Sequence, residues 1–224
     1  MPSKYKQLGE NVSNVLIPQR KTSILSSFTF ENFMTTLTTK RLILRPWKES
    51  DLKPFAELNA DPRVMEYLIG PLSQQESNEL AARIQNNIKE QEWGFWAVEA
   101  PGIADFIGFI GLAHVLYSTP FTPAVEIGWR LAYDYWGKGY ATESAKAALD
   151  FGFQSLKLNE IVSFTVVNNL SSQHVMEKLG MHRDPKDDFD HPKVPEGHRL
   201  KRHILYRLKK NEWEKASEST EIIE

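Results

Sequence analysis

A strand-like segment that runs through a glycine-rich turn into a helix-like segment is the feature that most constrains the fold of this chain. In AVEIGWRL, at 124–131, large apolar residues alternate strictly with other residues, as in a β-strand that turns one face to a core. The turn YWGKGYATES follows at 135–144, and Ala141, Ala145 and Leu149 then recur at helical spacing. Because the first of these residues are small, the helix can pack closely over a sheet, which predicts a mixed α/β domain.

The turn itself has two interpretations. A turn from a strand into a helix leaves backbone N–H groups without partners at the positive end of the helix dipole, so it can bind a diphosphate, with Lys138 supplying a mobile charge. Gly137 and Gly139 let a phosphate approach without meeting a Cβ atom. The sequence is not a Walker A loop, because Tyr140 follows Gly139, and not a dinucleotide fingerprint, because Thr142 stands where a third glycine is needed. A tight turn without a ligand fits these residues equally well.

Composition narrows the function classes. The chain has 224 residues, of which 41% are hydrophobic and 25% charged, as expected for one ordinary globular domain. Its formal net charge of −2 offers no broad positive field for nucleic acid, and no apolar run reaches the ~20 residues that span a bilayer. The lack of Cys excludes disulfides, cysteine nucleophiles and thiolate metal sites. We therefore expect a cytoplasmic protein that binds neither nucleic acid nor membranes.

The chain divides into an extension, one domain and a tail. Residues 1–36 are polar and lack clear periodicity, which predicts a flexible N-terminal extension, whereas 37–215 form the domain and 216–224 a C-terminal tail. Met34 offers an alternative start directly before the domain. The first predicted elements are a strand at 41–45, a helix capped at Ser50 with Asp51 in its first turn, and a helix after the capping box Ser73–Glu76. Strands at 94–99, 106–117 and 124–131 come next, followed by the helix after the glycine turn. A strand at 160–167, a short helix from Asn169 to Gly180 and a strand at 202–208 complete the domain.

Two motifs together carry a resemblance to a known family. VEIGWRLAYDYWGKGYATES, followed by NNLSSQHVMEKLGM at 168–181, resembles the acyl-CoA signature of the GNAT N-acetyltransferase superfamily, close to its RimJ/RimL-like branch of protein N-terminal acetyltransferases. The similarity covers roughly Leu37 to Trp213. It implies an α+β fold with a mostly antiparallel central sheet, a splayed parallel pair of strands and flanking helices. It also implies acetyl-CoA as cosubstrate, an amine acceptor, no metal, and a monomer or homodimer.

The resemblance assigns residues to the cosubstrate. In such proteins the glycine loop resembles the one that binds the pyrophosphate of coenzyme A, and the splayed strands offer main-chain groups to the pantetheine amides. The residues that match these positions, with two from the second motif, are Trp129, Leu131, Trp136, Gly137, Lys138, Gly139, Tyr140, Ala141, Thr142, Asn169 and Ser172. One departure is Asp134, since the wider superfamily usually has Arg or Gln three residues before the first glycine. We therefore expect the backbone, not a side chain at 134, to bind the phosphates.

Transfer to an amine needs a base and a proton donor, and one candidate for each stands in the motifs. Glu126 lies about 20 Å from the phosphate loop at ~3.3 Å per strand residue, and it resembles the base of many superfamily members. The alternative is a solvated strand face on which Glu126 pairs with Arg130. Many members place a proton-donating Tyr where this chain has Met176, a thioether that cannot donate a proton, so we expect Ser172 of the branch's N-x-x-S pattern to serve. The alternative there is a first-turn serine without function after the N-cap Asn169.

The remaining polar cluster lies near the C-terminal end. It comprises His182, Asp187, Asp188, Asp190, His191, His198 and His203. Their spacing matches no metal-ligand pattern, so we expect the loop at 188–203 to lie beside the substrate entrance instead. The sequence thus predicts an acetyl-CoA-dependent N-acetyltransferase that acts on a protein N-terminal amine or a small amine. The alternatives are a non-catalytic acyl-CoA-binding regulatory module and an acyltransferase for another acyl chain.

Overall fold

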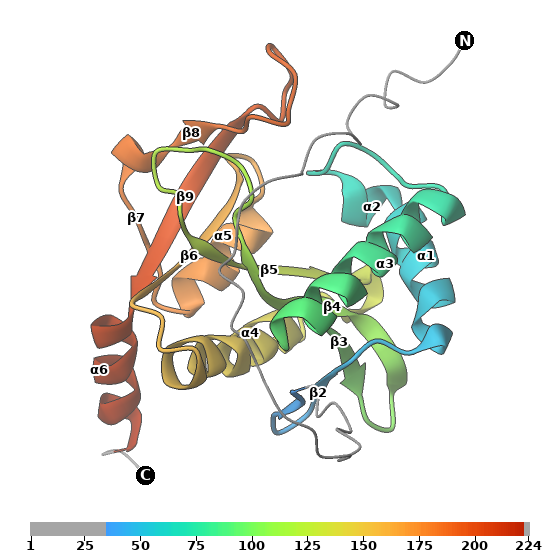
Figure 1. Cartoon of the computed structure of the whole chain (residues 1–224), viewed down its shortest axis with the longest axis horizontal. Helices are drawn as coiled ribbons and strands as arrows, with labels where there is room; N and C mark the ends of the chain where they lie inside the picture. Colours follow the sequence, from blue (N-terminus) through green and yellow to red (C-terminus); the bar gives the residue numbers. More distant parts are fainter. Residues whose placement is uncertain (1–34, 222–224) are drawn as a thin grey trace, which may run out of the picture. The chain divides into compact units, whose positions relative to one another are not determined.

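The computed structural model describes residues 35–221 (Figure 1). Most of the predicted N-terminal extension therefore lies outside the described residues. The strands are β1 (Leu37–Thr38), β2 (Ile43–Arg45), β3 (Phe95–Ala100), β4 (Ala104–His114), β5 (Val125–Leu131), β6 (Glu160–Val166), β7 (His182–Arg183), β8 (Phe189–Asp190) and β9 (Arg202–Lys209). The helices are α1 (Leu52–Ala60), α2 (Pro62–Met65), α3 (Gln74–Gln91), α4 (Tyr140–Asp150), α5 (Leu170–Lys178) and α6 (Lys210–Glu221).

One sheet organises these elements. Its strand order is β1-β2-β3-β4-β5-β6-β9-β7, with β8 paired to β9, and every neighbouring pair is antiparallel except β5 and β6. This parallel pair has a single register partner, Glu126 opposite Val162, whereas β4 and β5 pair continuously from Gly108–Leu131 to His114–Val125. The predicted α+β fold with a splayed parallel pair is therefore confirmed.

Helices cover the two faces of the sheet with separate cores. On one face α4 packs its Ala145 and Leu149 against the apolar side of β5, as its small residues predict. On the other face α1 and α3 form a core with β3 and β4 that includes Phe55, Ile84 and Phe109. Figure 1 shows α1 and α3 together, away from α5 and α6. Apolar burial on both faces supplies most of the stabilising free energy of such a sheet.

Local signals set the helix ends as predicted in two cases. Ser73 and Glu76 form the capping box of α3, because the Ser73 side chain accepts from Glu76 N and the Glu76 carboxylate accepts from Ser73 N at 2.8 Å. Asn169 caps α5 by accepting from Ser172 N at 3.2 Å, and Gly180, with φ 77°, follows its end in the left-handed region.

The predicted N-terminus of α1 is wrong in detail. Ser50 is not an N-cap, because residues 49–51 form a 3₁₀ turn before the helix. Asp51 is buried and accepts two hydrogen bonds from the Arg45 guanidinium, at 2.8 and 2.9 Å, and one from Lys48 N at 2.7 Å. The Arg45 guanidinium, six residues away, and Lys48 N therefore bind the carboxylate that local reasoning assigned to the helix dipole.

The C-terminal region contains elements that the pattern did not predict. Helix α6 follows β9 directly and runs across the boundary expected at 215/216, and β7 and β8 are short additions to the edge at β9. Trp213 of α6 is buried, and its Nε1–H donates to Asp150 at 2.7 Å. Within the described range, no helix is both long and apolar enough to cross a membrane.

Candidate active site

The glycine turn presents backbone N–H groups at the start of α4. Gly137 and Gly139 have φ of 72° and 80°, in the left-handed region that a side chain disfavours. The first bond inside the helix runs from Glu143 N to the Gly139 carbonyl at 3.0 Å. The N–H groups of Tyr140, Ala141 and Thr142 consequently have no acceptor within the helix, and together with the dipole they form an anion-binding end.

Arg41, from the loop between β1 and β2, stabilises this turn, and sequence reasoning missed it. Its Nη1 donates to the Lys138 carbonyl at 3.1 Å, its Nε donates to Glu143 at 2.6 Å, and its guanidinium lies 4.7 Å from the centre of the Tyr140 ring. In a trans peptide C=O and N–H point in opposite directions, so the N–H of Gly139 points away from Arg41. The contact spans 97 residues of sequence, and no local pattern could have indicated it.

A single cavity of about 660 Å³ connects the glycine turn with the gap between β5 and β6. Every residue predicted for the cosubstrate or for catalysis lines it except Lys138, which is exposed with its Nζ 5.5 Å from the Tyr135 ring centre. The lining residues among those predicted are Glu126, Trp129, Leu131, Trp136, Gly137, Gly139, Tyr140, Ala141, Thr142, Asn169 and Ser172. The fold therefore brings together around one cavity residues from a stretch of 47 sequence positions, 126 to 172.

The splay of β5 and β6 opens main-chain groups to this cavity. The Ile127 carbonyl points toward β6, where it accepts from the Ser163 hydroxyl at 2.9 Å. In an extended strand alternate residues direct their N–H and C=O to the same edge, so those of Trp129 face the same gap. No residue of β6 is in register with Trp129. The Leu131 carbonyl on this edge already accepts from Trp136 Nε1 at 2.8 Å.

Glu126 lies half-buried in the cavity wall. Burial raises the pKa of its carboxyl to about 7, and the positive charge of Lys193 opposes the shift. The neighbouring Tyr117 has its pKa raised by burial and by the Glu126 charge. The predicted alternative, an ion pair with Arg130, does not form, because Arg130 Nη1 donates to Asn59 Oδ1 at 2.5 Å. A carboxyl with a pKa near neutrality is suited to exchange protons at physiological pH.

Two histidines of the 188–203 loop region complete this end of the cavity. The rings of His191 and His203 lie 4.9 Å apart, and His191 lies 4.8 Å from the Tyr117 ring. Burial lowers the pKa of His191 to about 4, with the charges of His203, Lys193 and Lys201 adding to the effect, and burial also lowers the pKa of His203. Both rings are neutral near pH 7. Among residues 35–221 no group of three His, Cys, Asp or Glu could hold a metal ion.

Ser172, the predicted proton donor, is hydrogen-bonded to Asn169. Its hydroxyl oxygen accepts from Asn169 Nδ2 at 3.1 Å, and Asn169 Nδ2 also donates to Thr165 at 2.9 Å. A hydroxyl that accepts one bond keeps its own hydrogen as a donor, and Ser172 lines the cavity. Met176, which occupies the position where many superfamily members have Tyr, is buried and lines the same cavity.

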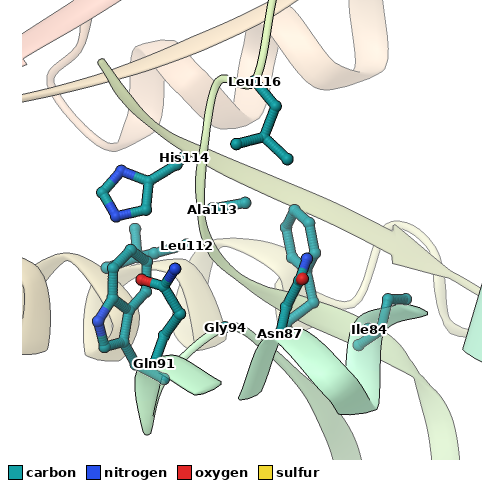
Figure 2. A pocket seen from close by; sticks show the side chains of 10 residues that line it. Ile84, Asn87, Gln91, Gly94, Leu112, Ala113, His114 and Leu116 are labelled. Atoms are coloured by element: carbon teal, nitrogen blue, oxygen red, sulfur yellow. The ribbon is translucent and has the colours of Figure 1, made fainter. Parts of the chain in front are cut away.

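A second, much smaller cavity lies between the end of α3 and strand β4 (Figure 2). Its volume is about 50 Å³, enough for a few water molecules. Figure 2 shows Asn87 and Gln91 on one side and His114 and Leu116 on the other. Ile84 and Phe95 line both cavities and so stand between them. The larger cavity is therefore the one that can hold a cosubstrate and an acceptor.

Comparisons with known proteins agree with this geometry. A family model described as Acetyltransferase (GNAT) domain matches residues 41–182. The chain is 33% identical over 152 residues to the Bacillus subtilis protein named Uncharacterized protein YkkB, covering 67% of this chain and 87% of that protein. It is 29% identical over 189 residues to FsC-acetyl coenzyme A-N(2)-transacetylase of Aspergillus fumigatus, covering 80% and 77%. It is 28% identical over 138 residues to spermidine N(1)-acetyltransferase of Escherichia coli K12, covering 61% and 70%.

Solved structures show the same arrangement. An acetyltransferase (GNAT family) from Bacillus anthracis superposes with a TM-score of 0.65 at 25% identity, covering 79% of this chain and 99% of that one. Mycobacterium smegmatis RimJ in complex with CoA-disulfide superposes with a TM-score of 0.64 at 15% identity, covering 83% and 96%. The second likeness is one of fold alone.

Proposed function

This chain belongs to the GNAT acetyltransferase family and is an N-acetyltransferase of that family, and we propose that it moves the acetyl group of acetyl-CoA directly onto a primary amine. The observation that carries this proposal is the single cavity that joins the glycine turn, the gap beside β5 and Glu126. A regulatory module that only bound CoA would need the first two of these features and not the third. Direct transfer needs donor and acceptor in one space, which this cavity provides.

The glycine turn and the β5 edge suit an extended donor. The N–H groups of Gly139 to Thr142 would hold the diphosphate, and the main chain at Trp129 would hold the pantetheine amides. When bound, acetyl-CoA supplies the thioester whose acyl group is transferred. Asp134 is exposed in the 3₁₀ turn before the glycines, and it takes no part in the proposal.

Glu126 acts as the base in this proposal. An amine acceptor arrives mainly as an ammonium ion, and it must lose a proton before it can attack a carbonyl carbon. Glu126 receives this proton, directly or through one water molecule. Its raised pKa of about 7 keeps the ionised form available at neutral pH while making the carboxylate basic enough for the task.

Ser172 donates the proton that the departing thiolate needs. Its position at the first turn of α5 is held from two sides, because Asn169 accepts from its backbone N–H and donates to its hydroxyl. Asn169 thereby serves as an N-cap and positions the donor at once, so the two functions predicted for it are compatible.

The acceptor we propose is a small amine. We take the acceptor end of the cavity to be the part lined by Val64, Tyr67 and Leu68 after α1 and by His191 and His203. Among the curated relatives, one is named for spermidine, a small amine, and one is named FsC-acetyl coenzyme A-N(2)-transacetylase. Two solved structures are named for ribosomal-protein acceptors, but at 18% and 19% identity they support the fold alone. A protein N-terminus, which the RimJ/RimL-like branch would imply, is the second candidate, and the likeness to RimJ supports it through the fold alone.

The test is release of CoA thiol from acetyl-CoA by the purified protein. The panel contains ω-amino acids, polyamines, aminoglycosides and peptides that differ in their first residue. Turnover of small amines with no turnover of peptides supports the proposal. Turnover of peptides alone would replace it with the protein-acetylating alternative. Thermal stabilisation by CoA without thiol release on any acceptor would favour the regulatory module.

A further inference from the structure

Arg130 is a half-buried cation in the wall of the cavity, next to α1. It lies two residues beyond Gly128 on the face of β5 that also carries Glu126, and it lines the same cavity. Burial lowers the pKa of its guanidinium to about 10, which still leaves it charged at pH 7. No other charge contributes to that shift. A cation that is partly shielded from water is costly unless something offsets its charge.

The contacts of Arg130 hold it in place without neutralising it. Its Nη1 donates to Asn59 Oδ1 at 2.5 Å, and its guanidinium lies 5.4 Å from the centre of the Phe109 ring. Asn59 in turn donates to Ser77 at 2.9 Å, and both of these residues are fully buried. Across residues 35–221 no carboxylate forms an ion pair with Arg130, whereas Arg41, Arg45 and Arg63 each do.

The guanidinium therefore has donors to spare on its cavity side. It carries five N–H groups, and Asn59 accepts from Nη1 alone. The side chain is surrounded by protein and yet not fully inaccessible, since its remaining accessible surface opens into the cavity that it lines. A fork of free N–H donors in a partly enclosed pocket matches a carboxylate, which it can bind through two parallel hydrogen bonds.

From this geometry we propose that Arg130 binds a carboxylate of the acceptor, so that the substrate is a primary amine that also carries an acid group. The inference rests on the proposed function, because it takes the cavity to be the acceptor site. It makes Arg130 a specificity-determining residue. It also disfavours polyamines, since their second ammonium group would face a buried cation of the same sign.

The spacing along β5 indicates how far apart the two groups of the substrate stand. Glu126 and Arg130 are four residues apart, which separates their Cα atoms by about 13 Å. The Phe95 ring lies over Gly128 between them, 3.3 Å from where a Cβ would stand, so a substrate that reaches both groups passes beside this ring. The amine near Glu126 and the acid near Arg130 must therefore be several bonds apart, as in an ω-amino acid rather than at the α-amino group of an amino acid.

A structural role alone would not explain why position 130 carries a charge. The chain Arg130–Asn59–Ser77 does tie β5 to α1 and α3. However, a glutamine or methionine could fill the space between Phe109 and Asn59 without a charge to bury. The test must therefore separate a loss of folding from a loss of carboxylate recognition.

The experiment compares three matched acceptor series with saturating acetyl-CoA. One series contains 4-aminobutanoate, 5-aminopentanoate and 6-aminohexanoate, the second contains their carboxamides, and the third contains the alkylamines of equal length. We expect kcat/KM for the best acid to exceed that for its amide by about 10- to 100-fold, as expected for hydrogen bonds to a charged group. Equal or lower values for the acids at every length overturn the inference, and thiol release on other amines would then leave the proposed function standing.

Two variants and one control sharpen the result. In Arg130→Gln the ratio of kcat/KM for the acid to kcat/KM for its amide should fall to about one, while the KM for acetyl-CoA changes less than about threefold. Arg130→Lys should recover part of this ratio because it keeps the charge. Arg83→Gln removes an exposed arginine of α3 and should leave the ratio as in the wild type. A ratio that Arg130→Gln leaves unchanged contradicts the inference. If this variant does not fold, the comparison of the wild type across the three series still decides.

Binding without turnover separates the two proposals. If the wild type releases no thiol on any amine, the proposed function fails. The carboxylate inference is then tested by thermal stabilisation of the wild type with 6-aminohexanoate and its carboxamide. Greater stabilisation by the acid supports the inference, and equal stabilisation by the two compounds rejects it.

Discussion

Glu126→Gln should make the protein more stable and less active, and the gain in stability should grow with pH. The pKa of Glu126 is raised from 4.5 in a free chain to about 7 in the folded protein because the carboxyl is buried. Between these two values the folded state binds more protons than the unfolded state, so the free energy of unfolding falls as pH rises. Glutamine has nearly the same shape and no charge to bury, so the variant avoids this penalty.

The magnitude follows from the size of the shift. A difference of about 2.5 pH units at about 1.4 kcal/mol each gives a penalty of about 3 kcal/mol once the pH exceeds the folded pKa. At pH 5.5 only about 1 kcal/mol of that penalty is present, because the folded carboxyl is then mostly protonated. The variant should therefore gain about 2 kcal/mol more at pH 8.5 than at pH 5.5. Water in the cavity reduces both figures, so they are upper bounds.

Urea denaturation of the ligand-free protein at pH 5.5, 7 and 8.5 measures this difference. Glu57→Gln, which removes an exposed carboxyl of α1, serves as the matched control, and its effect on stability is subtracted from that of Glu126→Gln at each pH. The same Glu126→Gln protein should lose about 10²- to 10⁴-fold in kcat/KM, most strongly at low pH where the acceptor is most protonated. A stability difference that does not change with pH would contradict the assignment of a raised pKa. An unchanged pH-rate profile would remove Glu126 as the base.

Three further outcomes are expected. Ser172→Ala should lower kcat by about 10- to 100-fold in the thiol-release assay, while the KM for acetyl-CoA stays within about threefold, because the hydroxyl acts on the leaving group and not in binding. An unaltered kcat would mean that water, not Ser172, protonates the departing thiolate. Gly139→Ala should lose about 1–2 kcal/mol of stability, since its φ of 80° is strained for any residue with a Cβ, and calorimetry should show weaker CoA binding; unchanged values in both measurements would contradict the turn geometry. Asp51→Ala should lower the free energy of unfolding, measured by urea denaturation, by about 3 kcal/mol or more, because it leaves the buried Arg45 without its bidentate partner. A loss below about 1 kcal/mol would show that Glu99 alone is enough to pair with Arg45.

Local sequence patterns were enough to predict the strand, the turn and the helix start that build the site. The alternation in 124–131 places Glu126 and Arg130 on one face of β5, and the structure has them on the face covered by α1 and α3. The glycines at 137 and 139 adopt the left-handed conformation that makes them necessary. Asn169 caps α5 as its position predicts. Each of these features depends on residues within a few positions of one another, where spacing alone constrains geometry.

The contacts that give the site its chemistry were beyond such patterns. Arg41 reaches the Lys138 carbonyl across 97 residues, and Arg130 reaches Asn59 across 71. Whether Glu126 paired with Arg130 or stood apart from it was undecided from sequence, because alternation fixes a face and not a partner.

The sequence by itself determined the family, the order of the elements and the residues that meet at the turn from β5 to α4, because periodicity and turn chemistry act over short distances. Only the tertiary structure decided that Glu126 and Arg130 are both half-buried, that one cavity joins them to the glycine turn, and that Arg130 binds Asn59 rather than Glu126. The physical reason is that burial and pairing of charge depend on which distant segments the sheet brings together, and these contacts set the pKa values and free donors on which catalysis and recognition depend.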